Sequence, residues 1–113
     1  MSIAQSYYTA IGQKNIQEVE QYLHPHVQVI SPLIKKTGKA AVLEALKGFI
    51  AAFNTLTIRT AFSSPDQAML AVDVDYPTPI GSLQTASLIS FQDGLIVKIE
   101  LFFDGRPFEK KLA

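Results

Sequence analysis

The spacing of apolar residues changes at Thr55, and this change limits the folds open to the chain. Before Thr55, apolar residues recur at spacings of three and four, which is typical of amphipathic helices. After it they alternate with polar residues, which is typical of strands with one buried face. Turn-forming residues divide this second part into segments at 55–63, 68–76, 82–92 and 95–104. The sequence therefore predicts helices followed by an antiparallel meander of four strands.

The first part predicts two short helices, one strand and a third helix. Ser2 with Gln5 has the form of a capping box, and Asn15 with Glu18 repeats this signal. Alternation in HVQVISP predicts a short strand, and the KKTG segment after it is expected to be a loop. Helical spacing in KAAVLEALKGFIAAF predicts the third helix. The expected order is α-α-β-α-β-β-β-β, an α+β domain whose helices cover one face of a curved antiparallel sheet.

Composition excludes several classes of protein. At 113 residues the chain has the length of a single domain, expected to span 1–113. Ten basic and ten acidic residues give no net charge, and no basic cluster is large enough to attract nucleic acid. The chain has no cysteine, and no segment approaches the roughly 18 apolar residues of a membrane span. We expect a cytoplasmic protein with no nucleic-acid or membrane partner.

His24 and His26 flank Pro25 and form the only candidate metal pair. A zinc site normally needs three or four protein ligands, and no motif places a third. The alternative is a helix C-terminus at which the imidazoles meet the last carbonyl groups. We therefore expect no metal and no cofactor.

The hairpin around the dipeptide DG decides which face of the last strand is inside. A two-residue turn would place Ile89 opposite Lys98, whereas a three-residue loop pairs Ile89 with Val97. A shift of one residue turns every side chain to the other face. The three-residue loop separates apolar from charged residues better, so it is the favoured register. It puts Lys98 and Glu100 outside, where solvent or interface roles are expected and not catalysis.

The same register leaves an apolar group on the outer face. Leu88, Ile96 and Phe102 then lie on the side of the sheet that no helix covers. An exposed apolar group of this size is typical of a contact with another protein. We expect a homodimer formed through this face about a twofold axis.

The order of elements, together with YYTAIGQKNIQEVEQYL, HVQVISP, GKAAVLEALKGF and FQDGLIVKIELFFD, resembles the nuclear transport factor 2-like superfamily. More narrowly, it is similar to the SnoaL-like branch of polyketide cyclases and ketosteroid isomerases. The resemblance covers nearly the whole chain. It implies a cystatin-like, cone-shaped fold in which the curved sheet wraps around helices and an apolar pocket lies at the open end. Relatives include isomerases, cyclases, dehydratases, epoxide hydrolases and subunits that only bind or assemble, so the fold does not dictate the function.

Alignment with ketosteroid isomerases places the tyrosine donor of that site at Tyr7 and its base at Ser31. The donor is kept, but a serine cannot abstract a proton from carbon unaided. Tyr7 is either a pocket residue or part of the apolar stripe of the first helix. In the last strand, where the branch often carries ionisable groups, Ile99 and Leu101 offer an apolar wall.

Asp73 and Asp75 are the only closely spaced carboxylates on one strand face, about 6.6 Å apart along the strand. Such a pair could share acid and base roles. The alternate residues form the better apolar face, however, so the aspartates are expected to point outward, toward Arg59. A bend at the PTP segment would still bring one of them to the pocket mouth. The catalytic candidates are thus Tyr7, Asp73 and Asp75.

Any pocket should be apolar with a few hydroxyl groups, which suits a small, mostly apolar ligand. We expect either a cofactor-independent isomerase, cyclase or hydratase, or a non-catalytic ligand-binding or protein-interaction module. The inner hydroxyls of the strand predicted at 82–92, Thr85 and Ser87, either orient a ligand or bond to backbone and water. The expected ligand-binding residues are Tyr7, Val29, Ser31, Phe49, Phe53, Val74, Thr85, Ser87, Ile99 and Leu101.

Overall fold

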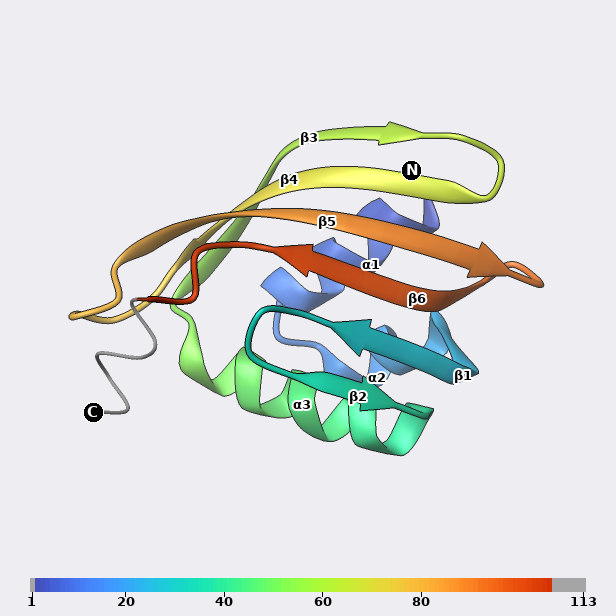
Figure 1. Cartoon of the computed structure of the whole chain (residues 1–113), viewed down its shortest axis with the longest axis horizontal. Helices are drawn as coiled ribbons and strands as arrows, with labels where there is room; N and C mark the ends of the chain where they lie inside the picture. The colour runs from blue at the N-terminus through green and yellow to red at the C-terminus, as the bar shows by residue number, and fades with distance from the viewer. Residues whose placement is uncertain (1, 107–113) are drawn as a thin grey trace.

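The computed structural model describes residues 2–106 and places three helices on one side of a curved sheet of six strands (Figure 1). The helices are α1 (Ile3–Gly12), α2 (Ile16–Gln21) and α3 (Lys39–Ala52). The strands are β1 (Leu23–Ile30), β2 (Lys35–Thr37), β3 (Thr55–Ser63), β4 (Gln67–Asp75), β5 (Ser82–Gln92) and β6 (Leu95–Phe102). The predicted α+β class is confirmed.

Both short helices begin at the predicted caps. The Ser2 hydroxyl accepts a hydrogen bond from the Gln5 backbone N–H at 3.2 Å, and the Gln5 side chain accepts one from the Ser2 backbone N–H at 3.1 Å. The Asn15 side chain accepts a hydrogen bond from the Glu18 backbone N–H, also at 3.2 Å. Such bonds satisfy amide groups that the first turn of a helix leaves unpaired.

The strand order is β2-β1-β6-β5-β4-β3, and β3 to β6 form the predicted antiparallel meander. Two features differ from the prediction. Strand β1 pairs with β6 in parallel, so the sheet is mixed, and the KKTG segment contributes the short strand β2, antiparallel to β1. Strand β2 is exposed along its length. It therefore lacks the alternating burial by which a strand is recognised in a sequence.

The turn between β5 and β6 is tighter than expected. Asp93 and Gly94 both have positive φ, 55° and 75°, and Phe91 lies opposite Ile96. These values are typical of a two-residue hairpin turn. The favoured three-residue loop is wrong, because aspartate tolerates the left-handed conformation and two residues are enough to close the turn.

A bulge follows this turn and restores the separation of the two faces. The register shifts near Val97, and beyond it Ile89 lies opposite Ile99. The bulge turns both Ile96 and Ile99 inward, where both are buried. Ile96 is therefore not on the outer face, contrary to the prediction. Lys98 and Glu100 do lie outside, joined by an ion pair of 2.9 Å.

The core lies between the inner face of the sheet and the helices. Helix α1 packs against β3, and α3 packs against β1. Large buried side chains come from both layers, including Ile11 of α1, Val42 of α3, and Leu70 and Ile89 of the sheet. Within residues 2–106, no helix has the length and apolar character needed to cross a membrane.

Candidate functional site

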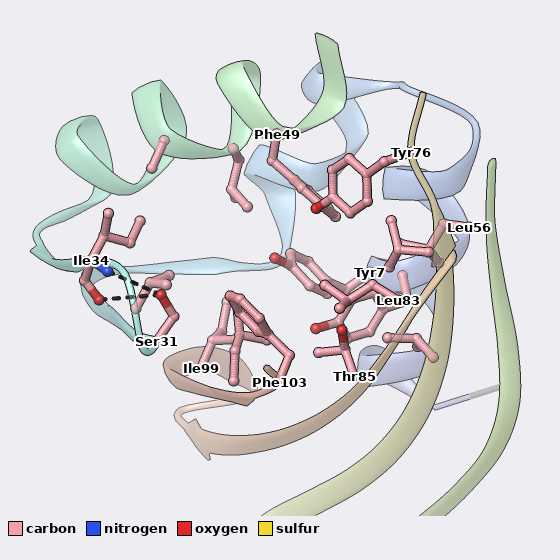
Figure 2. A pocket seen from close by; sticks show the side chains of 17 residues that line it. Tyr7, Ser31, Ile34, Phe49, Leu56, Tyr76, Leu83, Thr85, Ile99 and Phe103 are labelled. Carbon is pink, nitrogen blue, oxygen red and sulfur yellow. Dashed lines mark hydrogen bonds between the residues drawn. The ribbon is translucent and has the colours of Figure 1, made fainter. Parts of the chain in front are cut away.

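A cavity of about 140 Å³ lies between α1, α3 and the inner face of the sheet (Figure 2). It occupies the end of the sheet at which β6 finishes and β5 begins. Ile34 borders it and is exposed, so the cavity reaches solvent on that side. The lining residues are Tyr7, Tyr8, Val29, Ser31, Ile34, Ala45, Leu46, Phe49, Leu56, Val72, Val74, Tyr76, Leu83, Thr85, Ile99, Leu101 and Phe103.

Most of the residues predicted to bind a ligand line this cavity, but Phe53 and Ser87 do not. Phe53 follows α3 in an extended conformation and is buried beneath Lys14, whose Nζ donates a hydrogen bond to the Phe53 carbonyl oxygen at 2.6 Å. Ser87 is fully buried, and its hydroxyl accepts a hydrogen bond from the Tyr8 hydroxyl at 2.7 Å. Both residues therefore support the wall of the cavity from behind.

Several lining residues were not predicted from the sequence. Tyr8 is one of them, and its ring meets that of Tyr7 edge-to-face with centroids 4.9 Å apart. Tyr76 lies two residues beyond Val74, so the alternation of β4 was the signal that could have placed it. Ile34 carried no such signal, because it belongs to a turn next to the unpredicted strand β2.

Ser31 borders the cavity, but its hydroxyl belongs to a local turn. Its Oγ accepts hydrogen bonds from the backbone N–H groups of Leu33 and Ile34, at 3.2 and 3.1 Å. It also donates to the Ile34 carbonyl oxygen at 3.4 Å, as Figure 2 shows. These bonds stabilise the turn between β1 and β2 and leave the hydroxyl little capacity for a ligand. The position that aligns with the base of ketosteroid isomerases is thus a turn residue.

Tyr7 carries the hydroxyl that is most available to a ligand. Its side chain is buried and borders the cavity, and no group in residues 2–106 forms a hydrogen bond with its hydroxyl. Burial raises the pKa of Tyr7 well above its ordinary value, and the neighbouring Tyr8 raises it further. The phenol is therefore neutral at physiological pH and able to donate one hydrogen bond. Thr85 adds a second hydroxyl with no partner among the described residues.

Within residues 2–106, the residues that line the cavity include no aspartate, glutamate, histidine, lysine or arginine. Asp73 lies on the outer face, where it accepts hydrogen bonds from the Arg59 guanidinium at 2.6 and 3.3 Å. Asp75 is exposed at the end of β4. Because Val72 and Val74 face inward, the alternating strand directs both carboxylates away from the cavity. Both aspartates thus point outward, as the alternation predicted, and the polar side chains that line the cavity within residues 2–106 are phenols and hydroxyls.

His24 also differs from its expected place. It lies in β1 and not at a helix C-terminus, and its Nδ1 accepts a hydrogen bond from the His26 backbone N–H at 3.0 Å. Its Nε2 therefore carries the proton and lies 4.0 Å from Asp93. This imidazole stabilises the strand next to the β5–β6 turn.

Comparison with known proteins agrees with this fold. Residues 4–99 match the SnoaL-like domain family. A solved structure from Kribbella flavida has a TM-score of 0.89 and 20% identity over 96% of this chain and 88% of that one. A nuclear transport factor 2-like protein of unknown function from Cytophaga hutchinsonii gives 0.84 and 15%, over 95% of this chain and 91% of that one.

A second Kribbella flavida protein, proposed to be a ketosteroid isomerase, has a TM-score of 0.78 and 19% identity. The similarity covers 90% of this chain and 75% of that one. No curated protein matches the chain. At these identities the solved structures show a shared fold, and the family match extends over most of the sequence. The chain therefore belongs to the SnoaL-like domain family, and it shares its fold with a nuclear transport factor 2-like protein.

Proposed function

We propose that the chain binds a small, largely apolar molecule that carries a hydrogen-bond acceptor. The observation that supports this most strongly is the Tyr7 hydroxyl, a neutral donor that borders an apolar cavity and has no hydrogen-bond partner within residues 2–106. Among the described residues no inaccessible side-chain polar atom lacks a hydrogen-bond partner, so the Tyr7 hydroxyl is reached from the cavity. A ligand that brings a carbonyl or ether oxygen to Tyr7 would accept its hydrogen bond and fill the cavity.

The size of the cavity suggests which probes to use. Its volume of about 140 Å³ is close to that of an engineered apolar cavity of roughly 150 Å³ that binds benzene. A molecule with one ring is therefore the right scale, and its substituent can extend toward the exposed side at Ile34. Acetophenone and ethylbenzene form a matched pair, since they have similar shapes and only acetophenone carries a carbonyl oxygen.

We expect both probes to shift backbone amide NMR signals of residues around the cavity, with acetophenone binding more tightly. Tyr7→Phe should weaken acetophenone binding about three- to tenfold, because the variant loses one hydrogen bond to the ligand. It should leave ethylbenzene binding unchanged. Ala45→Phe should block both probes, because Ala45 lines the cavity. Ala51→Phe, at an exposed position of the same helix, is the matched control. Unchanged acetophenone binding by Tyr7→Phe, or binding of either probe by Ala45→Phe, would contradict the proposal.

A cofactor-independent isomerase, cyclase or hydratase activity is the second candidate. Tyr7 favours it, because a neutral phenol can stabilise negative charge that develops on a carbonyl oxygen. The lining residues within 2–106 offer no acid or base other than tyrosine, which counts against it. We expect the protein to leave unchanged the rate at which the methyl hydrogens of acetophenone exchange with D₂O, followed by NMR. Faster exchange that Tyr7→Phe abolishes would support catalysis instead.

A protein-interaction module with no ligand is the remaining alternative. It would be supported if neither probe bound to the wild-type chain. The cytoplasmic location expected from the sequence stays a prediction.

A further inference from the structure

The Tyr8 side chain reaches the wall of the cavity with its hydroxyl group. Its Oη lies 2.7 Å from the Oγ of Ser87, which is fully buried on the inner face of β5. Ser87 lies two residues from Thr85 on the same strand and the same face, and it is paired with Leu101 on β6. Thr85 and Leu101 both line the cavity, as does Tyr8 itself. The Tyr8 oxygen is therefore placed at the cavity wall, next to these two lining residues.

The hydrogen bond to Ser87 decides what the Tyr8 oxygen can offer to a ligand. A tyrosine hydroxyl has one proton, and Tyr8 donates that proton to the Ser87 Oγ. A phenol is the stronger donor of the two hydroxyls and an aliphatic hydroxyl oxygen is the better acceptor, which favours this direction. Burial raises the pKa of Tyr8 to about 12, so the phenol keeps its proton at physiological pH. The Tyr8 oxygen thus has a lone pair to offer and no free proton, which makes it an acceptor.

Tyr7 offers the opposite chemistry from the preceding position of α1. Its hydroxyl has no hydrogen-bond partner within residues 2–106, so its proton is free to be donated. Successive residues of an α-helix point about 100° apart, and the rings of Tyr7 and Tyr8 are inclined by 77° to each other. Their oxygens therefore approach the cavity from different directions. The cavity presents a donor and an acceptor on two separate atoms.

The remaining lining restricts the ligand to a neutral polar group. None of the lining residues within 2–106 has a side chain that is charged at neutral pH, so a carboxylate or an ammonium group would be buried without a counter-ion. A neutral group with an acceptor and a donor on two different atoms matches the two tyrosines. The carboxamide is such a group, because its carbonyl oxygen accepts a hydrogen bond and its N–H donates one.

We propose that the cavity selects ligands that carry a carboxamide, whose carbonyl oxygen accepts from the Tyr7 hydroxyl and whose N–H donates to the Tyr8 oxygen. Ser87 supports this selectivity, because it holds the Tyr8 proton and so keeps Tyr8 from acting as a second donor. Figure 2 shows Thr85 on the side of the cavity opposite Ile34, so the apolar part of the ligand would point toward the exposed side. This inference rests on the proposed binding of a small apolar ligand and adds the chemical class of its polar group.

Benzamide and acetophenone test the inference, since they have nearly the same shape and only benzamide carries N–H groups. Titrations followed by backbone amide NMR signals measure the binding of both. Tyr8→Phe should weaken benzamide binding about three- to tenfold, because one hydrogen bond to the ligand is lost, and should leave acetophenone binding unchanged. Tyr7→Phe is the matched control at the neighbouring position. It should weaken both probes to a similar extent, because both carry the carbonyl oxygen.

A second variant keeps the test valid if circular dichroism shows that Tyr8→Phe is unfolded. The combination of Tyr8→Phe with Ser87→Ala removes both hydroxyls of the buried hydrogen bond, so neither is left without a partner. The same difference between benzamide and acetophenone is expected for this double variant.

Equal weakening of both probes by Tyr8→Phe would show that Tyr8 donates to the carbonyl oxygen and would overturn the inference. Unchanged benzamide binding by this variant would overturn it too, and weaker benzamide binding by Thr85→Val instead would assign the acceptor to Thr85. A wild-type chain that binds acetophenone and not benzamide also contradicts it. In these three cases the proposed function stands and only the carboxamide selectivity fails, whereas a wild-type chain that binds neither probe would contradict both.

Discussion

Leu70 and Met69 are neighbours on β4, yet Leu70 is fully buried and Met69 is 40% exposed. The same contrast extends over the sheet. Its inner face holds the core and a cavity whose polar groups are hydroxyls, whereas its outer face holds paired charges and exposed apolar residues. The difference shows that one face of these strands is used for the core and the cavity, while the other carries side chains that are exposed or only partly buried. Four predictions test this division.

Of the four comparisons, we expect the largest difference in the free energy of unfolding between Leu70→Ala and Met69→Ala. Leu70→Ala removes buried methyl groups and leaves a void, so we expect the free energy of unfolding to fall by about 3 kcal/mol. Met69→Ala should lower it by less than about 1 kcal/mol, because the Met69 side chain is exposed. Urea denaturation measures both. Similar losses for the two variants would contradict the division into a buried and an exposed face.

The two adjacent tyrosines should also differ. Tyr8→Phe leaves the buried Ser87 hydroxyl without its donor, which should cost about 1–2 kcal/mol of stability. Tyr7→Phe breaks no hydrogen bond within the described residues and should change stability by less than about 0.5 kcal/mol, while it weakens ligand binding. Thermal unfolding of both variants gives the comparison. A larger loss for Tyr7→Phe would mean that its hydroxyl stabilises the fold and is not held for a ligand.

Alkaline pH should destabilise the inner face selectively. Burial raises the pKa of Tyr8 and of Tyr76 to about 12, against roughly 10 in an unfolded chain. The unfolded state then loses these protons first, so their contribution to stability is complete below about pH 10 and is lost as the pH rises through about 12. Urea denaturation at a series of pH values measures the slope. Tyr8→Phe should make stability fall less steeply with pH. If the variant shows the same slope as the wild type, the loss of stability does not come from the buried Tyr8.

The exposed ion pairs of the outer face should matter least. Arg59 and Asp73 are each partly solvated, so Arg59→Ala should lower the free energy of unfolding by less than about 0.5 kcal/mol. The effect should shrink further at high salt, because ions screen exposed charges. Denaturation at low and high salt measures it. A loss above about 1 kcal/mol that persists in high salt would show that the outer face contributes more to the fold than its exposure indicates.

Local signals made much of the fold predictable. The Ser2 and Asn15 caps act over three residues, and the alternation of the last four strands follows from one covered face, so both are visible in the sequence. The same alternation correctly placed Val74 and Thr85 along the cavity wall. It failed for strand β2, where no face is buried and no pattern is imposed.

Ile96 illustrates why the rest could not be predicted. Ile96 points inward because β6 has a bulge, that is, one more residue than β5 at this point of the pairing. A bulge of this kind is defined only once the two strands are paired. The sequence alone favoured the simple three-residue register, which puts Ile96 on the outer face. With the bulge, the chain can make the two-residue turn and still bury Ile99. The stabilisation comes from apolar surface that is buried only when the strands and helices have assembled, so neither strand sequence reveals it.

The amino-acid sequence by itself determined the helix starts, the meander and the apolar character of the pocket, because these depend on neighbours a few residues apart. Only the tertiary structure decided which of two adjacent tyrosines is left free. Tyr8 is bonded to Ser87, 79 residues away on β5, while Tyr7 faces the cavity with its hydroxyl unpaired among the described residues. Hydrogen bonds over such separations are set by the packing of a helix on a sheet, which local sequence patterns do not encode.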